Sequence, residues 1–335
     1  VSFQLPNWRE AVAIDIAAVW LGLVVNPVIP IYRDREVAFI LADSRARCLF
    51  IPGTYRGYNF SEMIERLSPQ LPDLQHVISV RHENSIDGVI QYEDLTRQRG
   101  GPAPDKQPTD MAAVKVIMYT SGTTGKPKGA ASTHFAICQA LYNMEMNAYS
   151  SAMANPDTIG KIMSSGYEPA TLLAVPLFHV SGCYAVFLLN LRGGRKTSIM
   201  YKWNPEEALR IIEAERISVF TGVPAMTMAL LESPAFPDTD TSSLFSLGAG
   251  GAASPPITSS MAIRISMGWA KPRADVNSKR HSESHSHFWW GATKVHRRFI
   301  SRKSKAAPGC FSSSVFMALP RVQSTRVKVS FKLRL

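Results

Sequence analysis

The chain contains 335 residues, 45% of them hydrophobic, which is enough apolar surface to bury a sizeable core. Its net charge of +11 would suit a nucleic-acid-binding protein, but the charge is unevenly distributed. Residues 1–257 carry 21 Lys and Arg against 24 Asp and Glu, whereas residues 258–335 carry 16 against 2. The near-neutral first part excludes a basic nucleic-acid-binding surface spread over the whole chain.

The cysteines and the apolar stretches exclude two further classes. The four cysteines lie far apart and form no CxxC pair, so we expect neither a zinc site nor a disulfide framework. The most apolar stretch, residues 16–25, is too short to span a bilayer. We expect a cytoplasmic protein without a transmembrane segment. Because the chain opens at Val1 rather than Met, we also expect part of its natural N-terminus to be missing.

The first elements predicted along the chain are a helix and a short buried strand. Asn7 stands at the expected N-cap of the helix, apolar residues follow it at helical spacing, and Gly22 ends it. Val24 and Val25 then predict a strand.

The same order of helix, short apolar strand and turn recurs further on. We predict helices over residues 34–43 and 206–215, and strands over residues 48–51, 172–175, 219–221 and 244–247. This alternation predicts an α/β fold with buried parallel strands. Residues 87–109 are rich in Gly and Pro and are predicted to be an exposed connection.

The pattern stops after Pro255 and Pro256. Residues 258–335 hold 14 Ser and show no apolar periodicity, so they cannot bury enough surface to offset their ordering entropy. We therefore predict a partial domain over residues 1–257 and a basic, Ser-rich tail over residues 258–335. We expect the tail to be disordered or poorly packed rather than a domain. Its clustered histidines lack Cys or carboxylate partners at regular spacing, so no metal site is predicted there.

The sharpest local pattern is an apolar strand that runs into a loop rich in glycine, hydroxyl groups and lysine. The segment from Val116 to Gly129 reads VIMYTSGTTGKPKG. Glycine lets backbone N–H groups approach an anion, hydroxyl groups donate hydrogen bonds, and the two lysines supply charge. The pattern predicts a phosphate-binding loop made of Thr120, Ser121, Gly122, Thr123, Thr124, Gly125, Lys126 and Lys128.

Two alternatives to this loop are disfavoured. A Walker A loop ending in Gly125 and Lys126 needs Gly at position 120 and Ser or Thr at position 127, where the chain has Thr120 and Pro127. A surface turn rich in Ser, Thr and Gly would not need two lysines directly after a buried strand.

The run from Tyr119 to Gly129 closely resembles the nucleotide-binding signature of the adenylate-forming (AMP-binding) superfamily, which includes acyl-CoA synthetases, firefly luciferase and the adenylation domains of peptide synthetases. Further segments resemble the family in the same order, at residues 5–7, 22–30, 176–182, 203–207, 222–224 and 247–252. The resemblance extends to about Pro256. It implies an incomplete large N-terminal domain, with parallel sheets flanked by helices in αβαβα order.

The resemblance also implies roles for site residues. The loop from Thr120 to Lys128 would surround the β- and γ-phosphates of ATP while a carboxylate attacks the α-phosphorus. His179 and Val223 would border the acid pocket. Without the resemblance, a core histidine bonded to the backbone would be the preferred interpretation of His179, and Val223 could equally be part of a chain reversal.

The residues beside the adenine ring would be Gly250, Gly251 and Ala252. A dinucleotide-binding turn is the alternative here, because Gly248, Gly250 and Ala253 have G-x-G-x-x-A spacing. That turn must open a helix, but two prolines follow it and the residues beyond show no helical stripe. The adenine-side interpretation is therefore preferred.

The function implied is that of an acid:CoA ligase acting on a fatty or related acid, with ATP, Mg²⁺ and CoA. The chain lacks the family's Tyr-Gly-x-Thr-Glu segment, whose glutamate holds magnesium, and the domain that carries the adenylation lysine. We therefore predict no catalytic residue and no metal ligand within this chain, and little turnover by it. The alternative is a catalytically defective nucleotide- or acid-binding fragment. A nucleic-acid-binding protein, which only the tail suggests, is disfavoured.

Overall fold

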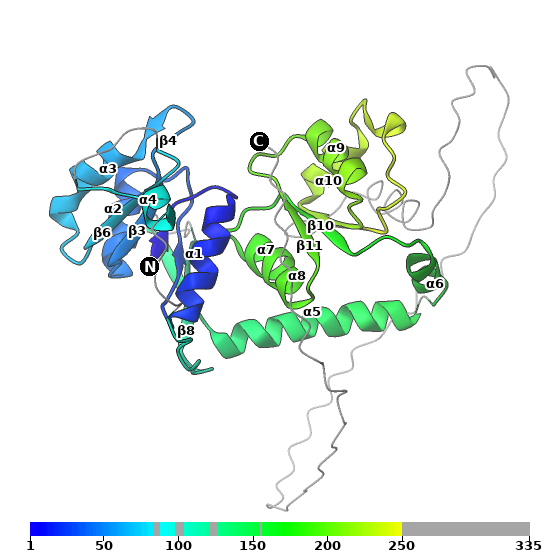
Figure 1. Cartoon of the computed structure of the whole chain (residues 1–335), viewed down its shortest axis with the longest axis horizontal. Helices are drawn as coiled ribbons and strands as arrows, with labels where there is room; N and C mark the ends of the chain where they lie inside the picture. The colour runs from blue at the N-terminus through cyan, green and yellow to red at the C-terminus, as the bar shows by residue number, and fades with distance from the viewer. Residues whose placement is uncertain (83–87, 98–103, 121–125, 155, 250–335) are drawn as a thin grey trace, which may run out of the picture. The chain divides into compact units, whose positions relative to one another are not determined.

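Two parallel sheets, each with its own helices, organise the described part of the chain (Figure 1). The computed structural model describes residues 1–82, 88–97, 104–120, 126–154 and 156–249. The chain divides into two units, and every described residue belongs to the first of them. The predicted α/β fold with parallel strands is confirmed. The predicted tail lies outside the described residues, and the division at residue 257 stays a prediction.

The first sheet has the strand order β2-β1-β3-β6-β7, and all four pairings are parallel. The strands are β1 Ser2–Phe3, β2 Asn26–Pro27, β3 Cys48–Pro52, β6 His76–Val80 and β7 Ile90–Gln91. The helices are α1 Arg9–Trp20, α2 Asp34–Asp43, α3 Phe60–Leu67 and α4 Tyr92–Arg97. Strands β2 and β3 lie on opposite sides of β1, so the order of the sheet reverses there.

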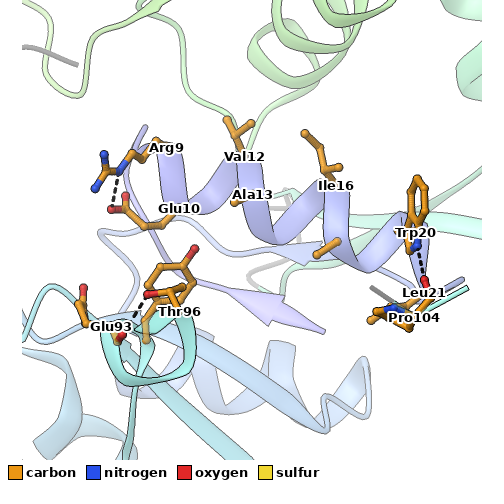
Figure 2. Close-up of a pocket in the computed structure, with 12 residues that line it drawn as sticks. Arg9, Glu10, Val12, Ala13, Ile16, Trp20, Leu21, Glu93, Thr96 and Pro104 are labelled. Carbon is orange, nitrogen blue, oxygen red and sulfur yellow. Dashed lines mark hydrogen bonds and ion pairs between the residues drawn. The ribbon is translucent and has the colours of Figure 1, made fainter. Parts of the chain in front are cut away.

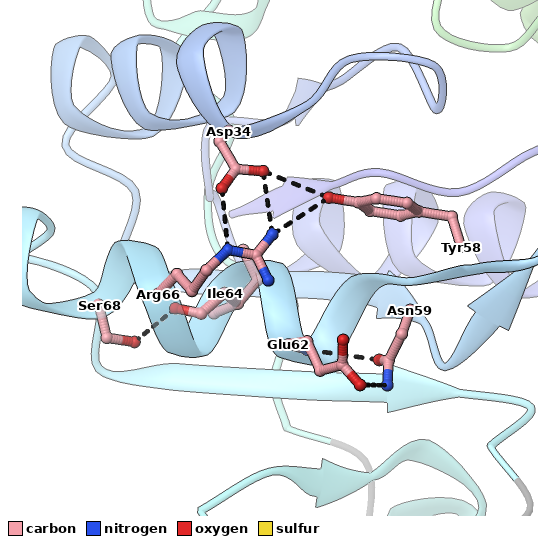
Figure 3. A network of polar contacts seen from close by, with 7 residues as sticks. All are labelled: Asp34, Tyr58, Asn59, Glu62, Ile64, Arg66 and Ser68. Carbon is pink, nitrogen blue, oxygen red and sulfur yellow. Dashed lines mark hydrogen bonds and ion pairs between the residues drawn. The ribbon is translucent and has the colours of Figure 1, made fainter.

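Polar side chains fix where the helices of this sheet begin (Figure 3). The Asn59 side chain accepts hydrogen bonds from the amides of Ser61 and Glu62, which caps α3. Asp34, the first residue of α2, accepts hydrogen bonds from Arg66 at 3.1 and 3.2 Å and from the Tyr58 hydroxyl at 3.2 Å. These contacts tie the start of α2 to α3. The short antiparallel pair β4 Thr54–Tyr55 and β5 Tyr58–Asn59 precedes α3.

The second sheet has the strand order β11-β10-β12-β13, again wholly parallel. Its strands are β10 Ala170–Leu173, β11 Lys196–Ile199, β12 Val219–Gly222 and β13 Ser246–Ala249. A helical run formed by α7 Val180–Gly182, the π-helical η2 Cys183–Leu188 and α8 Leu189–Arg192 connects β10 to β11. Helices α9 Pro205–Glu215 and α10 Pro224–Leu231 lie together beside β10 and β12 (Figure 1), where Leu209, Ile212 and Leu230 join one core with Phe220.

An antiparallel hairpin and two helices lie between the two sheets in sequence. They are β8 Val114–Thr120, β9 Lys128–Thr133, α5 His134–Ala154 and α6 Pro156–Ser164. The hairpin is attached to the first sheet through a parallel bridge between Val25 and Val116. Beside this bridge, Lys115 Nζ donates to Asp15 Oδ1 at 2.5 Å, and both side chains are buried. A buried cation needs such a partner, so this pair fixes β8 to α1.

Most predicted elements are present, with small shifts. The helix over residues 34–43 is confirmed, and β3, α9 and β12 each differ by one residue from the prediction. Strand β10 begins and ends about two residues before the predicted range, and β13 about two residues after it. The apolar residues extend beyond the end of β10 and before the start of β13. No described helix is long and apolar enough to cross a bilayer.

Three predictions were wrong. The first predicted strand is not formed by Val24 and Val25, because β2 is Asn26–Pro27 and Val25 pairs only in the bridge to Val116. Residues 87–109 are not simply a connection, since they contain β7 and α4. Strand β7 has only two residues, and such a short edge strand is defined by its pairing with β6 rather than by any sequence pattern. Asn7 is also not the N-cap of α1, because that position is Trp8, without a side-chain cap.

Candidate functional site

Three of the predicted site segments follow the carboxyl ends of neighbouring strands in the second sheet. His179 comes after β10 and Val223 after β12, and these two strands lie side by side. Strand β11 pairs with β10 on its other side, so the sheet order reverses between β10 and β12. In open parallel sheets this reversal opens a crevice at the carboxyl ends, where ligands bind. The predicted acid-pocket residues thus flank the switch point.

The predicted adenine-side residues continue from the next strand. Strand β13 pairs with β12 in a register that sets Ala249 opposite Gly222. Gly250, Gly251 and Ala252 lie outside the described residues, so their position beside adenine stays a prediction. Their predecessor Ala249 is nevertheless at the same sheet edge.

His179 is exposed and caps a helix. Its Nδ1 accepts a hydrogen bond from the Ser181 amide at 3.3 Å and lies 2.8 Å from the Ser181 hydroxyl oxygen. Its carbonyl accepts from the Cys183 amide at 2.9 Å. The alternative of a core histidine is therefore wrong. The ring is held through Nδ1, and Nε2 is the nitrogen left to face a ligand.

The turn before His179 is tightly packed against the helical run that follows it. The His179 amide donates to the Pro176 carbonyl at 3.2 Å. A Cβ atom added at Gly182 would lie only 2.1 Å from the Pro176 carbonyl oxygen and 2.8 Å from that of Val175. No side chain fits this space without moving the backbone. Gly182 is thus required for the close approach.

Asn7 joins this turn from the first sheet. Its Nδ2 donates to the carbonyls of Val175 at 2.9 Å and Met200 at 3.3 Å, and its Oδ1 accepts from the Leu177 amide at 2.8 Å. The partners are 168 to 193 residues away in sequence. Local patterns carry no signal for such contacts, which is why the sequence suggested a helix cap instead.

The β8–β9 hairpin presents the ends of the predicted phosphate loop. Thr120 is paired with Lys128, and both side chains are exposed. Directly opposite residues in an antiparallel pair share a face, so the hydroxyl and the ammonium group project from the same side. Lys126 is also exposed. Neither lysine forms a salt bridge with a described residue, which leaves both able to bind an anion. Ser121, Gly122, Thr123, Thr124 and Gly125 lie outside the described residues.

The other face of the same hairpin is anchored in the core. Tyr119 is 8% exposed, and its hydroxyl donates to Asp43 Oδ2, at the end of α2, over 2.6 Å. Burial, reinforced by this carboxylate, raises the pKa of Tyr119. Its register partner is Gly129, where an added Cβ would lie 3.0 Å from the tyrosine ring. The ring therefore packs against Gly129, and this contact holds the pair that precedes Thr120 and Lys128.

Val223 is the N-cap residue of α10 and is 40% exposed. Pro224 follows as the first helical residue, a position where its missing N–H has no cost. The exposed Val223 side chain could border a ligand at the carboxyl end of β12. Within the described residues, no group of three or more His, Cys, Asp or Glu could hold a metal ion.

A separate groove of about 730 Å³ runs along α1 (Figure 2). Apolar residues such as Ile16 and Trp20 line its length, and the Trp20 indole donates to the Pro104 carbonyl at one end. At the other end Glu10 is paired with Arg9 and Arg81. Among the described residues, none of those predicted to bind ATP or the acid lines this groove. We therefore assign neither ATP binding nor acid binding to this groove.

Comparison with known proteins gives similar sequences over most of the chain. The profile of the AMP-binding enzyme family matches residues 1–266. A (7a-methyl-1,5-dioxo-octahydro-1H-inden-4-yl)propanoyl:CoA ligase of Mycobacterium tuberculosis is 32% identical over 77% of this chain and 47% of its own length. The medium-chain fatty-acid–CoA ligase of Escherichia coli is 24% identical over 69% of this chain and 38% of its own length.

Solved structures share the fold of this chain. ATP-bound MatB from Rhodopseudomonas palustris superposes with a TM-score of 0.59 at 20% identity, over 77% of this chain and 45% of that chain. At that identity the likeness concerns the fold alone. This chain spans about half the length of the curated relatives it matches. Since the family profile covers most of its residues, the chain belongs to the AMP-binding enzyme family.

Proposed function

We propose that this protein takes part in the ATP-dependent activation of a carboxylic acid and its transfer to CoA. In the first step a carboxylate oxygen attacks the α-phosphorus of ATP, which forms an acyl-adenylate and releases pyrophosphate. In the second step the CoA thiol attacks the acyl carbon and AMP leaves. The observation that carries the proposal is the β8–β9 hairpin, which projects Thr120 and Lys128 from one side at the mouth of the loop.

The phosphate side is assigned to the loop. We assign Thr120, Lys126 and Lys128 to the β- and γ-phosphates, together with Ser121, Gly122, Thr123, Thr124 and Gly125 between them. Pyrophosphate gains negative charge as it leaves, so cations and N–H groups aimed at it lower the barrier. The core anchor of Tyr119 supports this assignment, since a group fixed before reaction loses less entropy on binding.

The acid and adenine sides are assigned to the second sheet. His179 and Val223 flank the switch point and would border the acid, and residues 250–252 would pass beside the adenine ring. The relatives named above act on a polycyclic propanoic acid and on medium-chain fatty acids. We propose a fatty or related apolar acid as the substrate class. In an apolar pocket one methylene changes binding by only about 1 to 3 kcal/mol, so neighbouring chain lengths would compete.

Mg²⁺ enters the proposal only as the ion that accompanies ATP. Because no cluster of described side chains fits a metal ion, we assign it no ligand in this chain and no step.

The alternative is a fragment that binds nucleotide or acid without turnover. Every residue assigned above has a binding role, which suits this alternative. Pyrophosphate release and thioester formation, assayed with octanoate, palmitate and benzoate, separate the two. Steady turnover would exclude the binding-only alternative, whereas ATP binding without pyrophosphate release would support it.

The loop assignment is tested with a double variant in which both Lys126 and Lys128 are replaced by Ala. Each charge-assisted contact to phosphate contributes about 1.5 to 3 kcal/mol, so calorimetric titration should show ATP affinity falling at least tenfold. The matched control replaces two other exposed lysines, Lys106 and Lys202, which changes the net charge equally. Equal losses in the two double variants would mean that the lysines act only through net charge, and the loop assignment would be wrong.

A further inference from the structure

Asn7 is a buried carboxamide whose three hydrogen bonds all reach the second sheet. It follows β1 of the first sheet by four residues and is only 7% exposed. Val175 and Leu177, which flank Pro176, supply an acceptor and a donor, and Met200 directly after β11 supplies a second acceptor. One side chain thus holds the chain beyond two neighbouring strands at their carboxyl ends.

The chemistry of these three contacts selects asparagine. The site needs two N–H donors and one oxygen acceptor from a short planar group, which is the inventory of a carboxamide. Aspartate of the same shape would accept from Leu177 but would turn negative oxygens toward the carbonyls of Val175 and Met200. Alanine would leave all three backbone groups without this partner, and an unsatisfied buried polar group destabilises a fold.

The turn that Asn7 holds leads directly to His179. Leu177 is buried, and the Pro176 carbonyl between the two pinned residues accepts the His179 amide. From the other side Gly182 packs directly on the same carbonyl. The backbone of Pro176 is therefore held between Asn7 and the helical run. The position of the His179 ring relative to the first sheet depends on this hold.

We propose that Asn7 is a positioning residue for the acid-binding side of the site, acting through the turn from Val175 to His179. It touches neither substrate nor reacting atoms. The proposal rests on the proposed function, because it takes His179 as a wall of the acid pocket. Acid binding, but not ATP binding, should then depend on the Asn7 side chain.

Asn26 provides a matched control. It is also a buried asparagine, 3% exposed, and its Nδ2 donates to the hydroxyls of Ser2 at 3.0 Å and Ser44 at 3.2 Å. These contacts remain within the first sheet and the residue that follows its helix α2. Asn26→Ala therefore removes a comparable set of bonds without touching the turn.

The first measurement needs no activity. Amide hydrogen exchange at Leu177 should accelerate at least tenfold in Asn7→Ala relative to wild type, and stay within twofold of wild type in Asn26→Ala. Asn7→Asp keeps the acceptor for the Leu177 amide, so Leu177 should stay protected in that variant. If Asn7→Ala does not fold, Asn7→Asp is used instead. That variant loses the hydrogen bonds to the carbonyls of Val175 and Met200, so hydrogen exchange should accelerate at Met200 and its neighbours. Equal exchange in the Asn7 and Asn26 variants would overturn the proposal.

The second measurement separates positioning from stability. In acid-dependent pyrophosphate exchange with octanoate and benzoate, Asn7→Ala and Asn7→Asp should raise the KM for acid by about 10- to 100-fold, with the KM for ATP within twofold. Asn26→Ala should leave both constants near wild type. Parallel shifts in the acid and ATP constants would reduce Asn7 to a structural residue. If the wild-type chain catalyses no exchange, the proposed function fails for this chain, and hydrogen exchange alone decides the role of Asn7.

Discussion

The β8–β9 hairpin and the turn from Val175 to His179 are each held in place by close packing, but in two different ways. Both hold a backbone segment next to a strand end, and both depend on a glycine that lets another group come close, Gly129 in the hairpin and Gly182 in the turn. In the hairpin the neighbour of the glycine is the ring of Tyr119, ten residues earlier. In the turn it is backbone, and the decisive partner, Asn7, lies 170 residues from Leu177. A side-chain neighbour can shift slightly, whereas a backbone neighbour cannot, so the turn should tolerate change less.

The largest effect is expected from Gly182→Ala. The new Cβ would start 2.1 Å from the Pro176 carbonyl oxygen, and only movement of the backbone can relieve that overlap. We expect a loss of about 3 kcal/mol or more in the free energy of unfolding, measured by urea denaturation. Gly160→Ala in α6 is the control, because nothing lies within 4 Å of its added Cβ. That variant should be neutral or slightly stabilising. Similar stability of the two variants would refute the tight turn.

A smaller effect is expected from Gly129→Ala. The added Cβ would lie 3.0 Å from the Tyr119 ring and 3.0 Å from Ile117, and the ring is held by burial and by Asp43. We expect a loss of about 2 kcal/mol. Tyr119→Phe frees the ring from Asp43, so it should absorb part of the strain. The double variant should then lose less stability than the sum of the single variants. Strict additivity in this cycle would show that the Asp43 bond does not hold the ring in place.

The smallest effect is expected from Tyr119→Phe alone. It removes one hydrogen bond to an exposed carboxylate, for a loss of about 1 kcal/mol near neutral pH. Burial and Asp43 raise the pKa of Tyr119 in the folded state, so the neutral phenol is favoured there. Its contribution is fully present below about pH 10, the usual pKa of tyrosine, and is lost progressively as the pH rises from there toward the higher pKa of the folded state.

The stability difference between wild type and Tyr119→Phe should therefore narrow above about pH 10, as followed by urea denaturation at several pH values. Burial also raises the pKa values of three other tyrosines, Tyr32, Tyr92 and Tyr184, which are present in both proteins. Wild type and Tyr119→Phe should therefore both lose stability in alkali. A difference that stays constant through this range would contradict the assigned state of Tyr119.

Sequence alone was sufficient where the determining contacts are local. The predicted phosphate role of the loop from Thr120 to Lys128 likewise rests on local sequence, because its glycines, hydroxyls and lysines lie within a few residues of one another, and it stays a prediction. The helix over residues 34–43 was predicted to the residue, since helical periodicity is a property of neighbours. The order of strands and helices likewise predicted parallel sheets, because a crossover helix requires them.

Only the tertiary structure decided what lies between the sheets. From the sequence, Asn7 was a plausible helix cap, and Asp43 was only the last residue of a helix. Hydrogen bonds between residues 76 to 193 positions apart leave no periodic trace, and burial of a single polar side chain depends on the packing of the whole sheet. The strand order, which sets His179 and Val223 on either side of the switch point, is equally a result of pairing between distant segments. The composition of the loop is thus a property of the sequence alone, whereas the fold decided which distant side chains hold the turn from Val175 to His179 in place.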